Sequence, residues 1–370
     1  MHMNGRTMIA VIVAGLATIA LGSSRTAGAD RYRIIDLGSL PGMPHSAVWQ
    51  QTINNGGAVV AYANPVADDI ASTAFFGDSA FIWKNGTSAP LPGLPGAIDT
   101  VPFSLNDEGQ VVGRSTPLGG RNVAVVWDHE VVYALGQLPG DNSSAALQIN
   151  NHGQAVGYSR KRPLRNGIDR RAVIWSRGTI TQLPSLAPSG GPALDEALGI
   201  NDHGQIVGFS GTVPGLEHIA LWDKHGVHDL GTLGGDWGEA VAINDSGQIS
   251  GLSLTASGDL EPFLWTNGVL TDLGVLAGDV GGAAEGMNNH GQVVGISGTS
   301  LVNGETTDIY KSHAVLWEHG AIINLQTQIP AGSGWTLTVA AGINDRGQIA
   351  AQGVHNGILR AVLLTPTHDG

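Results

Sequence analysis

The chain has 370 residues, no cysteine and a formal net charge of −13. Without cysteine there is no disulfide, thiol nucleophile or thiolate metal ligand, so the fold must depend on its core. The acidic balance argues against general binding to nucleic acid or to anionic membranes. Because only 13% of the residues are charged and 55 are glycine, the composition favours short strands joined by tight turns.

The first 29 residues have the pattern of a secretory signal peptide. Arg6 supplies a positive start, residues 8–21 are apolar, and Ala27-Gly28-Ala29 is a small-x-small cleavage site. A retained membrane anchor is the alternative, but the apolar run is shorter than the about 20 residues of a spanning helix. We expect the mature chain to begin at Asp30, to be secreted or periplasmic, and to have no membrane span.

One short pattern recurs seven times along the mature chain. It consists of Asn, then Asp or Asn, any residue, Gly and usually Gln. The copies begin at Asn54, Asn106, Asn150, Asn201, Asn244, Asn288 and Asn344. Successive copies are 43 to 56 residues apart, which is the length of one four-stranded propeller blade.

Each repeat is predicted to contain four short strands, named A to D. Strand A runs into the Asn, and the Gly of the A–B turn is expected in the left-handed conformation. Strand C ends in a Trp in six repeats and precedes a turn such as Asn85-Gly86, whose two residues need positive φ. The strand-end Trp residues are expected in the core between blades: Trp83, Trp127, Trp175, Trp222, Trp265 and Trp317.

The two ends of the mature chain complement each other. Residues 32–37 have the pattern of a strand D with no A, B or C before it, and residues 361–364 end in a strand C with no D after it. Pairing of these two strands would close a ring and protect its sheet edges. We therefore predict a single all-β domain over residues 30–370, a closed seven-bladed β-propeller with four-stranded blades, and expect a monomer.

The repeated motifs resemble the HAF repeat of predicted bacterial extracellular proteins. They include Ser-Ala-Phe-Ile-Trp at 79–83, Ile-Asn-Asp-His-Gly-Gln at 200–205 and Asp-Leu-Gly-Thr-Leu-Gly-Gly at 229–235. The resemblance covers nearly all of the mature chain and implies an extracellular, propeller-like protein. It implies no chemistry, because that family is known by its repeat.

The B–C and D–A loops vary among the repeats, whereas the turns at the other end are uniform, so we expect function on the B–C/D–A face. The B–C loop of the third repeat holds six cations of this acidic protein: Arg160, Lys161, Arg162, Arg165, Arg170 and Arg171. Such a loop could hold an acidic glycan or protein partner; the alternative is a solvated loop.

Two Trp residues fall outside the strand-end position. Trp237 and Trp335 lie in or near D–A connections. There they could stack on sugar faces or anchor a partner, and local packing is the alternative.

Acidic residues also gather in the D–A loops. They are Asp141, Asp236 and Asp279 at one equivalent position, with Glu196 and Glu239 in neighbouring places. They could bind Ca²⁺ or act as a paired acid and base on a glycan, and turn-capping is the alternative. No cofactor is predicted, and no other metal site.

The chain has no nucleophile elbow, His-Glu-x-x-His motif or phosphate-binding Gly-rich loop. Our leading hypothesis is therefore a binding or scaffold protein that recognises an envelope or extracellular carbohydrate or protein. A glycan hydrolase or lyase using the D–A carboxylates is the second, and a purely structural surface protein the third.

Overall fold

The structure is a computed structural model that describes residues 30–65, 78–129, 131–161, 169–188, 194–213, 216–298, 301–302, 305–306 and 311–367. The predicted signal peptide lies outside these ranges. Within them, no helix combines the length and the apolar character needed to cross a membrane. The described elements are strands, apart from one short 3₁₀ helix, η2 (Leu325–Gln328).

The first three sheets each contain four antiparallel strands that follow one another in the chain. Their members are β2 (His45–Ala47), β3 (Val59–Asn64), β4 (Ser79–Lys84) and β5 (Thr87–Pro90); β6 (Ala97–Leu105), β7 (Val111–Pro117), β8 (Val123–Asp128) and β9 (Val131–Ala134); and β10 (Ser143–Ile149), β11 (Ala155–Arg160), β12 (Arg170–Ser176) and β13 (Thr179–Gln182).

The remaining repeats continue the same order. They contain β14 (Asp195–Ile200), β15 (Ile206–Val213), β16 (Leu216–Asp223) and β17 (Gly226–Gly231); β18 (Gly234–Ile243), β19 (Ile249–Thr255), β20 (Leu260–Thr266) and β21 (Val269–Asp272); and β22 (Gly281–Met287), β23 (Val293–Gly298), β26 (Ser312–Glu318) and β27 (Ala321–Asn324). A two-stranded sheet of β24 (Leu301–Val302) and β25 (Glu305–Thr306) lies in the B–C connection of the sixth repeat.

The two ends of the described chain share one sheet. β1 (Tyr32–Asp36) pairs antiparallel with β30 (Ile358–Pro366), and β29 (Ile349–His355) and β28 (Trp335–Ile343) follow. The register runs from Tyr32 opposite Pro366 to Asp36 opposite Val362. As the sequence predicted, the N-terminal strand therefore takes the outer place beside a C-terminal strand.

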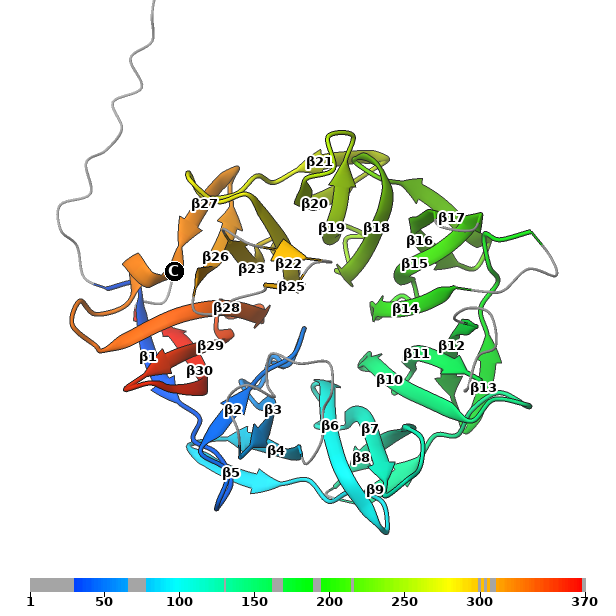
Figure 1. Cartoon of the computed structure of the whole chain (residues 1–370), viewed down its shortest axis with the longest axis horizontal. Coiled ribbons are helices and arrows are strands. Elements are labelled where there is room, and N and C mark those ends of the chain that lie inside the picture. The colour runs from blue at the N-terminus through cyan, green and yellow to red at the C-terminus, as the bar shows by residue number, and fades with distance from the viewer. Residues whose placement is uncertain are drawn as a thin grey trace, which may run out of the picture.

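The sheets are arranged radially about a common axis, with the first strand of each repeat nearest that axis, so the chain has a β-propeller arrangement (Figure 1). The prediction of seven separate four-stranded sheets differs from the structure. Five sheets are separate and four-stranded, whereas the fourth and fifth repeats form one eight-stranded sheet. They are joined because β16 and β18 extend far enough for Glu217 and Trp237 to make a parallel bridge.

The strand-end Trp residues lie in the core as predicted, except that Trp265 is half-buried. The Trp127 indole N–H donates to the Pro92 carbonyl at 2.7 Å, and that of Trp222 donates to the Pro184 carbonyl at 2.6 Å. Each carbonyl belongs to the connection that follows the preceding sheet. These two indoles therefore fill the space between adjacent sheets and also tie them together by hydrogen bonds.

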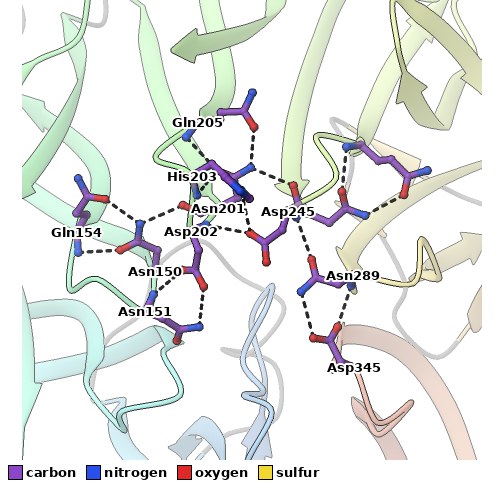
Figure 2. Close-up of polar contacts among 12 residues, drawn as sticks. Asn150, Asn151, Gln154, Asn201, Asp202, His203, Gln205, Asp245, Asn289 and Asp345 are labelled. Carbon is purple, nitrogen blue, oxygen red and sulfur yellow. Dashed lines mark hydrogen bonds and ion pairs between the residues drawn. The ribbon is translucent and has the colours of Figure 1, made fainter. Parts of the chain in front are cut away.

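Two circuits of hydrogen bonds run through the seven A–B turns, and Figure 2 shows a part of them. In the inner circuit, the side-chain amide of each repeated Asn donates to the backbone carbonyl of the next repeated Asn, at 2.9 to 3.2 Å. The last of these bonds joins Asn344 to Asn54. In the second circuit, the backbone N–H of each following Asp or Asn donates to the side-chain Oδ1 of its counterpart in the next repeat.

These circuits explain the repeated Asn-Asp/Asn pattern. The Asn244 side chain, 4% exposed, donates to Asn288 and Gln248 while its Oδ1 accepts from the Gln248 N–H. Only an amide can both donate and accept in this way. The Asp245 side chain accepts the Asp202 N–H, for which a carboxylate or an amide oxygen suffices. The Gly of this turn, Gly247, has φ +76°, the left-handed conformation that was predicted.

The two positions therefore differ in how they tolerate an exchange of Asn and Asp. We expect Asn244→Asp to lower the free energy of unfolding by about 3 kcal/mol, because it removes a buried donor and faces two acceptors with a carboxylate. Asp245→Asn is the matched control in the same turn and should change it by less than about 0.5 kcal/mol. Urea unfolding of both variants measures the difference, and equal effects would contradict the assigned roles.

Candidate functional site

A group of charged and aromatic side chains lies at the ends of the strands opposite the Asn turns. It spans the third, fourth and fifth repeats and contains three carboxylates, two guanidinium groups and two aromatic rings. We call it the arginine–glutamate cluster: Tyr158, Arg160, Arg170, Glu196, Glu217, Trp237 and Glu239. Five of its members were predicted from the sequence as ligand-binding or alternative catalytic residues.

Strand pairing places the two arginines side by side. Arg160 ends β11 and lies opposite Arg170, which begins β12. Their guanidinium carbons lie 4.8 and 5.1 Å from the centroid of the Tyr158 ring. Cation–π attraction to this ring partly offsets the repulsion between the two cations.

Arg170 is also bound to the next sheet. Its guanidinium forms an ion pair with Glu196 of β14, and its backbone forms a parallel bridge with Leu194. Burial lowers the pKa of Arg170 and nearby Arg160 lowers it too, whereas Tyr158, Glu217 and Glu239 act to raise it. Arg170 therefore lies among charges from three repeats.

Trp237 is held by the other side of the cluster. Its indole N–H donates to Glu217 Oε2 at 3.1 Å, and the two residues also form the parallel bridge between β16 and β18. The ring is half-buried against a core cluster that includes Val241 and Leu252. Burial raises the pKa of Glu217, while the Trp237 hydrogen bond and the Arg170 charge act to lower it. The indole thus has a fixed orientation at the edge of the cluster.

The D–A acids do not converge on one point. Asp141 accepts a hydrogen bond from Ser159 at 2.6 Å and forms an ion pair with Arg171. Asp279 accepts from Ser297 and lies 3.0 Å from His313 Nδ1. Asp236 is exposed. In the part of the chain that the structure describes, no three His, Asp or Glu side chains are arranged to hold a metal ion.

The remaining predicted residues lie apart from the cluster or outside the description. Trp335 stacks on His355 in the seventh repeat, with ring centroids 4.7 Å apart and planes at 16°. Lys161 is exposed. Arg162 and Arg165 lie outside the described residues.

A repeated serine at these strand ends was not predicted from the sequence. In five repeats, the hydroxyl of a Ser in strand B accepts a hydrogen bond from the backbone N–H of a Leu in the D–A connection. The pairs are Ser115–Leu94, Ser159–Leu138, Ser210–Leu186, Ser253–Leu233 and Ser297–Leu276. The available signal was a Gly-x-Ser motif in strand B. At Ser297, the Asp279 carboxylate separates the hydroxyl from His313, so no imidazole activates it as a nucleophile.

Tyr158 and Glu217 were also missed. Tyr158 occupies an ordinary strand B position, and Glu217 lies at the start of a strand C. Nothing in their local sequence separates them from other strand residues, because their partners come from another strand or another repeat.

Glu261, at the start of β20, predicts how stability depends on pH. Burial, with nearby Asp272 and Asp259, raises its pKa from 4.5 to about 7. The folded state therefore keeps a proton that the unfolded state releases near pH 4.5, so this group lowers stability as the pH rises from 4.5 to 7. We expect Glu261→Gln to raise the thermal midpoint at pH 8 and to leave it unchanged at pH 4, with Asp36→Asn, at an exposed position of β1, as the control. An equal gain at both pH values would contradict this assignment.

No protein-family model and no curated protein matches the sequence. Solved structures do match. The oligogalacturonate lyase from Vibrio parahaemolyticus is 11% identical, with a TM-score of 0.57 over 93% of this chain and 97% of that one. The β-propeller domain of the Trilobed protease from Pyrococcus furiosus, described as having an open velcro topology, is 11% identical, with a TM-score of 0.54 over 89% and 95%.

A puromycin-hydrolysing peptidase from Mycobacterium tuberculosis is 12% identical, with a TM-score of 0.55 over 90% of this chain. This chain spans 54% of the length of that peptidase. At such low identities the likenesses establish the fold alone, and the chain is a β-propeller.

Proposed function

We propose that this β-propeller is an exported protein that binds carbohydrate at the arginine–glutamate cluster. The observation that carries the proposal is the half-buried Trp237, oriented by Glu217 beside the Arg170–Glu196 ion pair. Sugar rings present apolar faces and many hydroxyl groups, so their sites combine aromatic rings with polar groups that donate and accept. The cluster offers both kinds of group at one place.

The position of the cluster supports a binding role. Its members come from strands of three repeats, and rigid strands hold side chains more precisely than loops do. The Trp237 indole N–H is already bound to Glu217, so little ordering is required when a ligand arrives. The varied B–C and D–A connections at this face can adapt the site to one ligand without disturbing the Asn turns.

No observation favours the alternative of a hydrolase or lyase. Two of the predicted acids form ion pairs within the protein, Asp141 with Arg171 and Glu196 with Arg170. Some of the similar structures are enzymes by name, including the lyase that acts on oligogalacturonate, but a shared fold does not transfer an activity.

We also propose that the ring comprises seven blade units closed by β1. The β1–β30 pairing and the Asn344–Asn54 hydrogen bond support this, with Glu217–Trp237 then a local link between the fourth and fifth units. The repeated blade units also support the proposed resemblance to the HAF-repeat proteins. The predicted signal peptide supports a location outside the cytoplasm.

Trp237→Ala tests the binding site. We expect it to weaken saturable binding of an oligosaccharide at least about tenfold, because the sugar face loses an aromatic contact of about 1.5 kcal/mol or more. The measurement is calorimetric titration of the mature chain with oligosaccharides first selected by thermal shift. The control is Tyr133→Ala, which removes an aromatic side chain 54% exposed on the outer strand β9. Equal affinity of wild type and Trp237→Ala would contradict the assigned site.

A disulfide tests the closure. Arg33 and Thr365 are paired in the β1–β30 register, and the chain has no other cysteine to interfere. We expect an Arg33→Cys, Thr365→Cys double variant to oxidise and to gain about 4 kcal/mol of stability, because the bond closes a very long loop. Titration of free thiols and thermal unfolding measure both effects.

The matched control pairs Arg33→Cys with Arg360→Cys, which is out of register with it. That pair should keep two free thiols. Free thiols in the in-register pair would contradict closure by β1.

A further inference from the structure

We propose that the carbohydrate bound at the arginine–glutamate cluster carries a carboxylate group, and that this carboxylate pairs with Arg160. The inference rests on the proposed function and names the chemical class of the ligand as a uronic-acid saccharide.

Arg160 is the basic member of the cluster that has no acidic partner. Its side chain is only 8% exposed, yet its guanidinium makes neither an ion pair nor a hydrogen bond within the described ranges. Its Nε is buried and has no acceptor there, as is also true of the Nε of Arg114, Arg170 and Arg171. The guanidinium carbon of Arg160 lies 4.8 Å from the centroid of the Tyr158 ring.

Four other arginines of the protein form ion pairs with carboxylates. Arg31 pairs with Glu318, Arg114 with Asp99, Arg170 with Glu196 and Arg171 with Asp141. A buried cation is costly unless it is paired and hydrogen-bonded, and an aromatic face offsets only part of that cost. Arg170 lies opposite Arg160 in the strand pairing, and the Glu196 carboxylate pairs with Arg170 and not with Arg160.

The chemistry of the pair selects a carboxylate. The planar guanidinium fork matches the two oxygens of a carboxylate, and a charge-assisted bond of this kind supplies the acceptor that Nε lacks. A uronic acid carries such a group on the same ring whose faces suit Trp237 and whose hydroxyls suit Glu217 and Glu239.

The test uses the mature chain, residues 30–370, and two probes. One is an oligosaccharide that contains glucuronic acid, and the other is the same oligosaccharide with its carboxyl groups reduced to alcohols. We expect wild type to bind the acidic form at least tenfold more tightly than the reduced form. Arg160→Met should lose this preference and still bind the reduced form.

Arg121→Met is the matched control, because Arg121 is an exposed cation in the B–C connection of the second repeat. It should keep the preference. If Arg160→Met also kept the preference, or if wild type bound both probes equally, the inference would be overturned while the carbohydrate-binding function stood. If wild type bound neither these probes nor any neutral oligosaccharide, the proposed function itself would fail.

The unliganded protein gives a second, independent readout. Arg160→Met removes an unpaired buried charge and keeps an apolar stem, so we expect its thermal midpoint to equal or exceed that of wild type. A lowered midpoint would mean that Arg160 has a structural partner in the free protein, and would overturn the inference even if binding were lost.

Discussion

The fold depends on a side-chain amide that both donates and accepts. In all seven turns, the Oδ1 of the repeated Asn accepts a backbone N–H of its own turn. Its Nδ2 donates to a backbone carbonyl of the next repeat, as at Asn54 and Asn344. Because every Asn is buried, no water can substitute for a lost partner. The second circuit adds backbone donors to Asp and Asn oxygens, and its Asn amides bond to neighbouring carboxylates, as Asn151 does to Asp107 and Asp202.

With one end of the sheets tied in this way, the other end is free to vary. The strand-end Trp residues keep adjacent sheets at a constant separation, and the Gly-x-Ser hydroxyls hold the D–A connections against strand B. Between these supports the third, fourth and fifth repeats place unlike side chains. The result is the arginine–glutamate cluster, in which charge and aromatic surface from separate repeats meet.

Two contacts between repeats position this cluster. The Arg170–Leu194 bridge joins the third repeat to the fourth, and the Glu217–Trp237 bridge joins the fourth to the fifth. Both lie at the strand ends where the cluster lies, so the backbone itself brings Arg170, Glu196 and Trp237 together. Of the two adjacent arginines, Arg170 forms an ion pair with Glu196, whereas Arg160 contacts the Tyr158 ring.

The sequence by itself determined the repeat, the four strands within it, the left-handed Gly turns, the core Trp positions and the pairing of the two chain ends. These features are set by local turn chemistry and period-two burial, which act within a few residues. It also named five residues that the structure brings together in the arginine–glutamate cluster. The tertiary structure alone decided that β16 and β18 join, that Asp141 and Asp279 are held by serines, and that Arg160 has no ion-pair partner among the described residues. Those outcomes depend on distances between repeats, which no local pattern encodes.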